Sequence, residues 1–206
     1  MTAYTTITAF AEDEFVEKRS RFICAIAPVT TAQEAADFIA KRKSLHYDAR
    51  HTVYAYILKD GNVQRFSDDG EPQGTGGMPA LEVLRRSGLV DVCVAITRYF
   101  GGILLGAGGL TRAYANGAAL AVAAANHITM RPCAICRIKM NYAQYGTLSR
   151  ILPEHGAKVT DSDFGADVVL TVCLPEENVE ALSLAVTEAT AATVAVEDID
   201  RVFGAI

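Results

Sequence analysis

The sequence predicts an α+β protein of two domains, residues 1–128 and 129–206. Short runs of β-branched and aromatic residues alternate with stretches whose apolar residues recur at helical spacing. After residue 129 the predicted elements follow the order β-α-β-β-α-β, which makes a complete unit. The charge also changes there: residues 1–128 hold 13 Lys and Arg and 13 Asp and Glu, whereas residues 129–206 hold 6 and 11.

The first half of the N-terminal domain is predicted to form strands around one helix. Residues 15–29 contain two short β-like runs. Residues 31–45 are predicted to be helical, because Thr31 can cap them and apolar residues recur on one face. The β-branched and aromatic stretch 51–58 is joined to residues 63–66 by KDGN, a turn typical of a β-hairpin.

Two helices and one buried strand are predicted for the rest of this domain. Pro79 stands in the first turn of a helix that Gly88 ends, and residues 91–100 form the strand. The uncharged stretch 113–130 is too weakly apolar to span a bilayer and indicates a tightly packed helix. That helix is predicted over residues 110–126, because one face holds only apolar or small residues: Leu110, Ala113, Tyr114, Gly117, Ala121 and Ala124.

The C-terminal domain is predicted from an alternation of short strands and helices. In chain order these are a strand over 134–141, a helix over 144–152, strands over 158–162 and 167–174, a helix opened by Pro175, and a strand over 193–199. This order is the split βαβ, or ferredoxin-like, pattern.

The composition excludes several classes of protein. Five scattered cysteines, an odd number, argue against a disulfide framework and favour a reducing compartment. The N-terminus has no basic segment before its acidic residues, so no secretory signal is predicted. The net charge of −5 lacks the basic excess of a typical nucleic-acid binder. We therefore expect a cytoplasmic protein that binds neither membranes nor DNA.

Cys133 and Cys136 have the spacing of half a zinc site, but no second cysteine pair follows. On a strand, two residues three positions apart also point to opposite faces. We therefore predict two small buried side chains there, no metal and no cofactor.

The first of two glycine-rich loops, DDGEPQGTGGMP over residues 68–79, combines three carboxylates with four glycines. Asp68, Asp69 and Glu71 can form a turn and favour the start of the following helix. Alternatively, together with His51 from the neighbouring strand, they can hold a divalent ion. The turn chemistry leaves the stretch Thr75–Met78 unexplained.

The second loop lies within TRYFGGILLGAGGLTRAY, residues 97–114, and joins the buried strand to a helix. Its amides converge on a helix N-terminus, where anions bind. Arg98 and Arg112 flank it with positive charge, and Tyr99 and Tyr114 offer flat faces for stacking. The loop matches neither the dinucleotide pattern nor the P-loop. Alternatively, its glycines only let the helix pack closely on the sheet.

Together, DDGEPQGTGGMPALEVL and TRYFGGILLGAGGLTRAY resemble the patterns DDGEPxGTAGxP and RYFGGxxLGxGGLxRAY of the IMPACT family. The resemblance covers about residues 15–125, includes His51, and departs only at Gly76, where the family usually has alanine. It implies a ribosomal protein S5 domain 2-like unit followed by a ferredoxin-like one. This pair is similar to the last two domains of the translocating elongation factor. Eukaryotic relatives are linked to translational control through a stress-responsive kinase pathway. They carry an extra N-terminal interaction domain that is not expected in this chain, so the resemblance does not imply the kinase link here.

Two functions follow as hypotheses. The first is a translation-associated regulatory or binding protein that contacts the ribosome, RNA or a ribosome-bound partner protein through the glycine-rich loops. The second is a small enzyme acting on a phosphorylated or nucleotide substrate at the same loops, although no nucleophile–base pair or loop lysine is present. A non-enzymatic role is therefore favoured, with no catalytic residue assigned.

The two loops are expected to form one surface site, in which the first loop is an acidic wall that repels long polyanions. The anion- or nucleic-acid-binding residues are Arg98, Tyr99, Gly101, Gly102, Gly106, Gly108, Gly109, Arg112 and Tyr114. The accessory residues are His51, Asp68, Asp69, Glu71, Gly74, Gly76 and Gly77.

Overall fold

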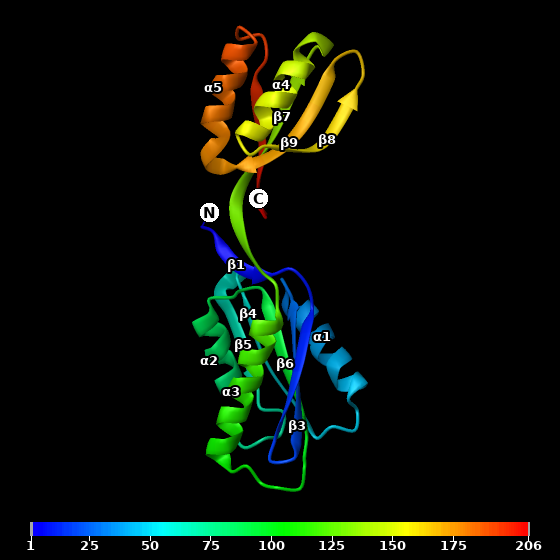
Figure 1. Cartoon of the computed structure of the whole chain (residues 1–206), viewed down its shortest axis with the longest axis vertical. Coiled ribbons are helices and arrows are strands. Elements are labelled where there is room, and N and C mark those ends of the chain that lie inside the picture. Colours follow the sequence, from blue (N-terminus) through cyan, green and yellow to red (C-terminus); the bar gives the residue numbers. More distant parts are fainter. Residues whose placement is uncertain (1, 206) are drawn as a thin grey trace. The chain divides into compact units, whose positions relative to one another are not determined.

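The computed structural model describes residues 2–205 and divides into two compact units (Figure 1). The first unit is Tyr4–Ile128, and the second begins at Thr129. Both units mix helices and antiparallel strands, in agreement with the α+β class that the sequence predicts. Within residues 2–205, no helix is long and apolar enough to cross a membrane.

The first unit is built on a five-stranded sheet in which every neighbouring pair of strands is antiparallel. From one edge to the other the strands are β2 (Ala11–Glu17), β3 (Ser20–Pro28), β6 (Val92–Tyr99), β4 (His51–Leu58) and β5 (Val63–Ser67). The predicted β4–β5 hairpin is present, with a short 3-10 turn at Asp60–Asn62. A further strand, β1 (Tyr4–Ile7), lies outside this sheet.

Helices cover both faces of this sheet (Figure 1). α2 (Gly77–Ser87) and α3 (Ala107–Ala124) pack on one face, and α1 (Ala32–Leu45) packs on the other. Side chains alternate along β6, so Val94 contributes to the core under α2 and α3 while Cys93 contributes to the core under α1. The central strand is thus buried on both sides, as its continuous apolar sequence indicates.

Several boundaries differ from the prediction, among them β10, which runs Val196–Gly204 where 193–199 was predicted, and two of those in the first unit have a local reason. β2 starts at Ala11, before the predicted residue 15, because an exposed edge strand of charged residues carries no apolar alternation. α3 starts at Ala107, earlier than predicted, because its first turn contains glycines that are poor helix formers. The uncharged stretch 113–130 is helical only to Ala124, and a strand begins at His127.

The second unit follows the predicted order of elements. These are β7 (His127–Met140), α4 (Tyr142–Glu154), β8 (Lys158–Phe164), β9 (Val168–Pro175), a 3-10 turn (Glu176–Asn178), α5 (Val179–Ala189) and β10 (Val196–Gly204). The strands pair antiparallel in the order β10-β7-β9-β8. One apolar core joins β7 and β9 to α4 and α5.

The cysteines of the described chain are free thiols. Cys136 belongs to the core of the second unit, whereas Cys133 is buried but lies outside that core. The two thiols are thus placed on opposite faces of β7, as their spacing predicts.

Helix α3 packs so closely on the sheet that Gly117 tolerates no side chain. A Cβ atom at Gly117 would lie 2.9 Å from Sγ of Cys24 and 3.2 Å from Cγ2 of Ile96. We expect Gly117→Ala to lower the free energy of unfolding by about 1–3 kcal/mol, because the core would be overpacked. Urea denaturation measures this change.

Gly108→Ala is the matched control in the same helix. Its Cβ would meet only the far end of the Arg112 side chain, at 3.7 Å. This variant should be as stable as the natural sequence or slightly more stable, since alanine favours helix. Equal stability of the two variants would mean that close packing does not explain the glycine at 117.

Candidate functional site

A buried ion pair joins the two glycine-rich loops of the first unit. Oε1 of Glu71 accepts hydrogen bonds from Nη1 of Arg98 and from the hydroxyl of Tyr114, each at 2.7 Å. The side chains of Glu71 and Arg98 are only 4% and 7% exposed. Since Glu71 lies in the first loop, Arg98 on β6 and Tyr114 on α3, one carboxylate fixes three segments to one another.

The guanidinium of Arg98 also connects the β2–β3 turn to the second loop. Its Nη2 donates to Oγ of Ser20 at 3.3 Å, and the same oxygen accepts from the amide of Gly101 at 3.2 Å. A Cβ on Gly101 would come within 2.0 Å of the Arg19 carbonyl, so only glycine allows this approach. The turn and the loop therefore lie side by side at one end of the unit (Figure 1).

The carboxylate of Asp68 accepts hydrogen bonds from the protein itself. The amides of Gly74, Gly76 and Gly77 donate to it at 2.8, 2.9 and 2.8 Å. These amides lead into α2, so the side chain of Asp68 provides the anion at the start of that helix. The stretch Thr75–Met78 that turn chemistry left unexplained is thus the binding loop for an internal carboxylate.

The carboxylate of Asp69 also has partners within the protein. It pairs with Nζ of Lys43 at 2.5 Å and accepts from the amide of Thr52 at 2.7 Å. The expectation that Asp68, Asp69 and Glu71 form an acidic wall against polyanions is therefore wrong. Glu71 and Asp69 form ion pairs with Arg98 and Lys43, and the carboxylate of Asp68 is directed to the amides at the start of α2.

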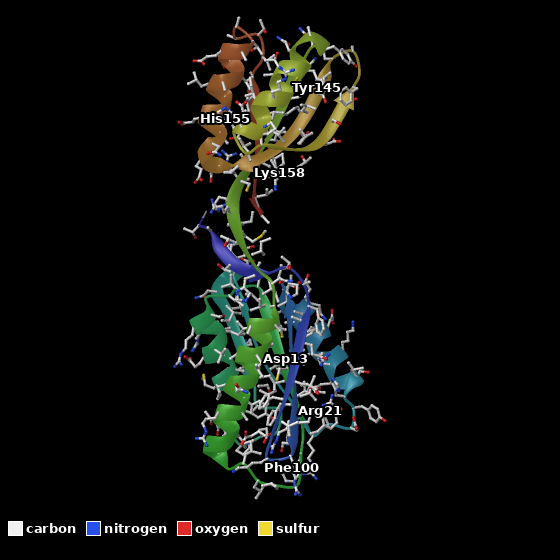
Figure 2. All side chains as sticks on the ribbon, viewed as in Figure 1. Asp13, Arg21, Phe100, Tyr145, His155 and Lys158 are labelled. Atoms are coloured by element: carbon white, nitrogen blue, oxygen red, sulfur yellow. The ribbon has the colours of Figure 1, made fainter. Side chains whose placement is uncertain are left out.

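A cavity of about 340 Å³ lies between the two loops, and we call it the loop cavity. Its polar lining comes from Arg50, His51, Glu71 and Arg98, and its apolar lining from Phe100, Leu104, Leu105 and Leu110. The start of α3, at Gly106 and Ala107, also borders it. Figure 2 shows Phe100 at this end of the unit, on the loop that follows β6.

A second cavity, of about 290 Å³, lies on the other side of the first turn of α3. Its charged lining is Glu17, Lys18 and Arg112, and Leu105 borders both cavities. Arg112 therefore lies close to the second loop, as predicted, but it does not line the loop cavity. Positive side chains are thus placed on both sides of the start of α3.

The first turn of α3 differs from that of α2. Gly106 is the N-cap residue of α3 and offers no side chain to the helix amides, whereas α2 receives the carboxylate of Asp68. Gly108 and Gly109 lie in this first turn, where amides have no partner within the helix. Of these two helix starts, only that of α3 has amides without a side-chain acceptor, and the anion site that the sequence predicts stays a prediction for this helix.

His51 lies at the wall of the loop cavity. Its Nδ1 donates to the carbonyl of Asp69 at 2.8 Å, so in the neutral ring Nε2 is the acceptor. Among the described residues, no group of three or more His, Cys, Asp and Glu side chains is placed to hold a metal ion. His51 and the acidic residues of the first loop are thus not gathered into such a group.

Two predicted stacking residues lie elsewhere. Tyr114 is fully buried, with its ring against Phe22 and its hydroxyl on Glu71, because its position on α3 faces the sheet. Burial, followed by the negative charge of Glu71, raises the pKa of Tyr114 above its ordinary value. Tyr99 lies on the face of β6 opposite to Arg98, where its hydroxyl donates to Asp48 at 3.0 Å.

The prediction of one surface patch formed by Arg98, Tyr99 and Arg112 is therefore wrong. Arg98 is buried, and alternation along the strand sends Tyr99 to the other side. Several residues at this end of the unit were not predicted from the sequence: Lys18, Arg19, Ser20, Arg50, Phe100 and Leu104. Lys18 and Arg19 follow β2, far from the loops in sequence, and nothing in the local pattern links them.

Comparisons with known proteins identify the class to which this fold and these loops belong. Residues 18–122 match the Impact N-terminal domain, and residues 138–193 match a domain of unknown function, DUF1949. The chain belongs to the IMPACT family, as the resemblance of its loops indicated.

Bacterial relatives cover most of the chain. IMPACT family member YvyE of Bacillus subtilis is 39% identical over 192 residues, which are 91% of this chain and 87% of that protein. IMPACT family member YigZ of Escherichia coli is 36% identical over 169 residues, 81% of this chain and 83% of that protein. A crystal structure of a hypothetical protein, 31% identical, has a TM-score of 0.64 and matches 97% of this chain and 98% of its own.

Removal of the buried carboxylate of Glu71 should lower the stability of the protein strongly. We expect Glu71→Ala to reduce the free energy of unfolding by about 3–5 kcal/mol, because it leaves the charge of Arg98 buried without its partner. Tyr114→Phe removes one hydrogen bond and keeps the ion pair, so it should cost only about 1 kcal/mol. Urea denaturation measures the free energy of unfolding of both variants. If Glu71→Ala loses no more of it than Tyr114→Phe does, the ion pair does not have a central role in stability.

The carboxylate of Asp68 should make the stability of the protein depend on pH. Burial opposes its charge, but the hydrogen bonds from Gly74, Gly77 and Gly76 outweigh this and lower the pKa of Asp68 below its ordinary 3.8. The stabilisation is therefore present above pH 3.8 and is lost as the pH falls further, through the lowered pKa. Asp68→Asn should lower the melting temperature at pH 7, and the difference from the natural sequence should shrink towards pH 3.

Asp60→Asn is the control for this titration, because Asp60 is an exposed carboxylate in a turn. Its melting temperature should follow that of the natural sequence at each pH. A constant difference between Asp68→Asn and the natural sequence from pH 7 to pH 3 would show that the charge of Asp68 is not what stabilises the loop.

Proposed function

We propose that the chain is a translation-associated binding protein that contacts ribosomal RNA through the loop end of its first unit. The observation that carries this proposal is the arrangement of charge there. The acidic residues of the first loop are paired internally, whereas Lys18, Arg19 and Arg112 are exposed. Exposed cations of this kind supply affinity for the phosphate backbone.

The RNA element would be short and unpaired. Both units together carry a net charge of −5, so an extended duplex would meet unfavourable charge outside the loop end. Beside the cations the second loop exposes apolar side chains, with Phe100 43%, Ile103 40% and Leu104 83% exposed. Unstacked bases bind such surfaces, whereas paired bases do not present their faces.

The fold supports the same proposal by analogy. We propose a ribosomal protein S5 domain 2-like fold for the first unit and a ferredoxin-like fold for the second. The strand order β10-β7-β9-β8, with α4 and α5 against one face, favours the second assignment. The family resemblance implies a similarity to two domains of the translocating elongation factor, which is an argument from fold and not from a site. A cytoplasmic location follows from this function.

Sedimentation with ribosomes tests the proposal. The full chain should sediment with ribosomes at low salt and dissociate as salt rises. The double variant Arg19→Ala/Arg112→Ala should bind about tenfold or more weakly, and its salt dependence should be shallower by about 0.7–0.9 for each phosphate that the variant no longer neutralises. Its melting temperature should stay close to that of the natural sequence, because both side chains are exposed.

The matched control removes the same charge from another surface. Arg85→Ala/Arg86→Ala changes two exposed arginines in the last turn of α2. This variant should sediment with ribosomes as the natural sequence does. Equal weakening by both double variants would indicate a general charge effect, and no weakening by either would contradict a contact at the loop end.

A second candidate, a small enzyme acting on a nucleotide or phosphorylated substrate, is favoured by His51. Its Nε2 is an acceptor at the wall of the loop cavity, so it can serve as a general base. Turnover of a bound nucleotide that is abolished in His51→Ala would favour the enzyme. Binding without any change to the nucleotide would favour the binding protein.

A further inference from the structure

We propose that the loop cavity binds the phosphomonoester of a molecule that carries a flat aromatic ring. A nucleoside monophosphate and the 5′-phosphorylated end of an RNA chain both have this chemistry. The inference rests on the proposed function, because it names the chemical group that the same loops would hold.

The start of α3 is the first reason to expect an anion. α2 and α3 both follow glycine-rich loops, and each presents backbone amides at its first turn. At α2 these amides bind the carboxylate of Asp68 at 2.8–2.9 Å. At α3 no side chain caps the helix, and its first residues, Gly106 and Ala107, border the loop cavity. The positive end of α3 is therefore directed to the cavity.

Arg98 is the second and independent reason. Its residue is 6% exposed and lines the cavity, yet its Nε is buried and has no hydrogen-bond partner among the described residues. Buried polar atoms of this kind are normally paired. The guanidinium thus has one N–H that no group of the described protein uses, after Nη1 and Nη2 have bonded Glu71 and Ser20.

The charge of the cavity favours a phosphate over a neutral group. Arg98 and Glu71 neutralise each other, and Arg50 adds one positive charge at the cavity wall. Arg50 is exposed and forms no hydrogen bond or ion pair with another described residue, so its donors can bind an anion. A phosphomonoester carries about −1.5 to −2 charges at pH 7, more than the single charge of a phosphodiester.

The apolar residues of the lining favour the face of an aromatic ring. Phe100, Leu104, Leu105 and Leu110 line the cavity beside the charged residues. The ring of Phe100 lies over the guanidinium of Arg98, with 5.4 Å between the guanidinium carbon and the ring centroid. The volume of about 340 Å³ is within the range of small-ligand sites, at its lower end. It accepts one nucleotide-sized ligand but no folded RNA element.

The test introduces a carboxylate where the phosphate would bind. Ala107 is exposed, lies in the first turn of α3 and borders the cavity. In Ala107→Asp the new negative charge repels the phosphate of the ligand. The same charge stabilises the positive end of α3, so the variant should fold with an unchanged or raised melting temperature. Ala107→Asn is the control of the same shape without the charge.

Isothermal titration calorimetry of the full chain measures binding of adenosine 5′-monophosphate, inorganic phosphate and adenosine. We expect the monophosphate to bind most tightly, Ala107→Asp to weaken it at least tenfold, and Ala107→Asn to change it by no more than about twofold. Arg50→Ala should weaken it about tenfold, whereas Arg86→Ala should not. Equal binding by Ala107→Asp and Ala107→Asn would overturn the proposal.

A short oligoribonucleotide, with and without a 5′-phosphate, distinguishes the two sources of the ligand. Binding at least tenfold tighter than that of the monophosphate, and dependent on the 5′-phosphate, would identify an RNA end. Equal or weaker binding would identify a free nucleotide. If neither adenosine 5′-monophosphate nor the phosphorylated oligonucleotide binds the natural sequence, the inference is wrong. Sedimentation of Arg19→Ala/Arg112→Ala with ribosomes remains a separate measurement, so the proposed function can fail while phosphate binding holds.

Discussion

The buried carboxylate of Glu71 is the interaction on which the loop end of the first unit depends. It joins Arg98 on β6 and Tyr114 on α3 to the first glycine-rich loop, and Arg98 in turn reaches Ser20 at the β2–β3 turn. A buried charge is tolerated only when it is paired and hydrogen-bonded. These segments therefore keep one arrangement, and the loop cavity between them has fixed walls.

This constraint also decides the electrostatics of the surface. Asp69 and Glu71 form ion pairs and Asp68 accepts hydrogen bonds from backbone amides, so two of the three carboxylates of the first loop are neutralised within the protein. Beside α3, Lys18 and Arg112 lie with Glu17 around one cavity, so positive charges exceed negative ones there by one. In an acidic protein this small excess is the basis of the proposed contact with a phosphate group.

The two glycine-rich loops have different physical roles, although they look alike. The first surrounds an internal carboxylate, which satisfies the amides that lead into α2. The second crosses the β2–β3 turn at Gly101 and leads into an α3 whose first turn has no side-chain cap. The amides of the first loop are thus bonded to its own Asp68. The second loop leads to the start of α3, which borders the loop cavity.

The sequence alone determined the elements and the family. The β4–β5 hairpin and the β-α-β-β-α-β order follow from local periodicity and turn residues, which act over a few neighbours. The sequence also predicted that the two loops lie together, and Arg98, His51 and Glu71 line one cavity, although its role as a binding site stays a prediction. Only the tertiary structure decided which of these side chains are exposed. The burial of Arg98 and Tyr114, and the placement of Arg50 and Lys18 beside α3, depend on contacts between residues far apart in the chain, which no local pattern encodes.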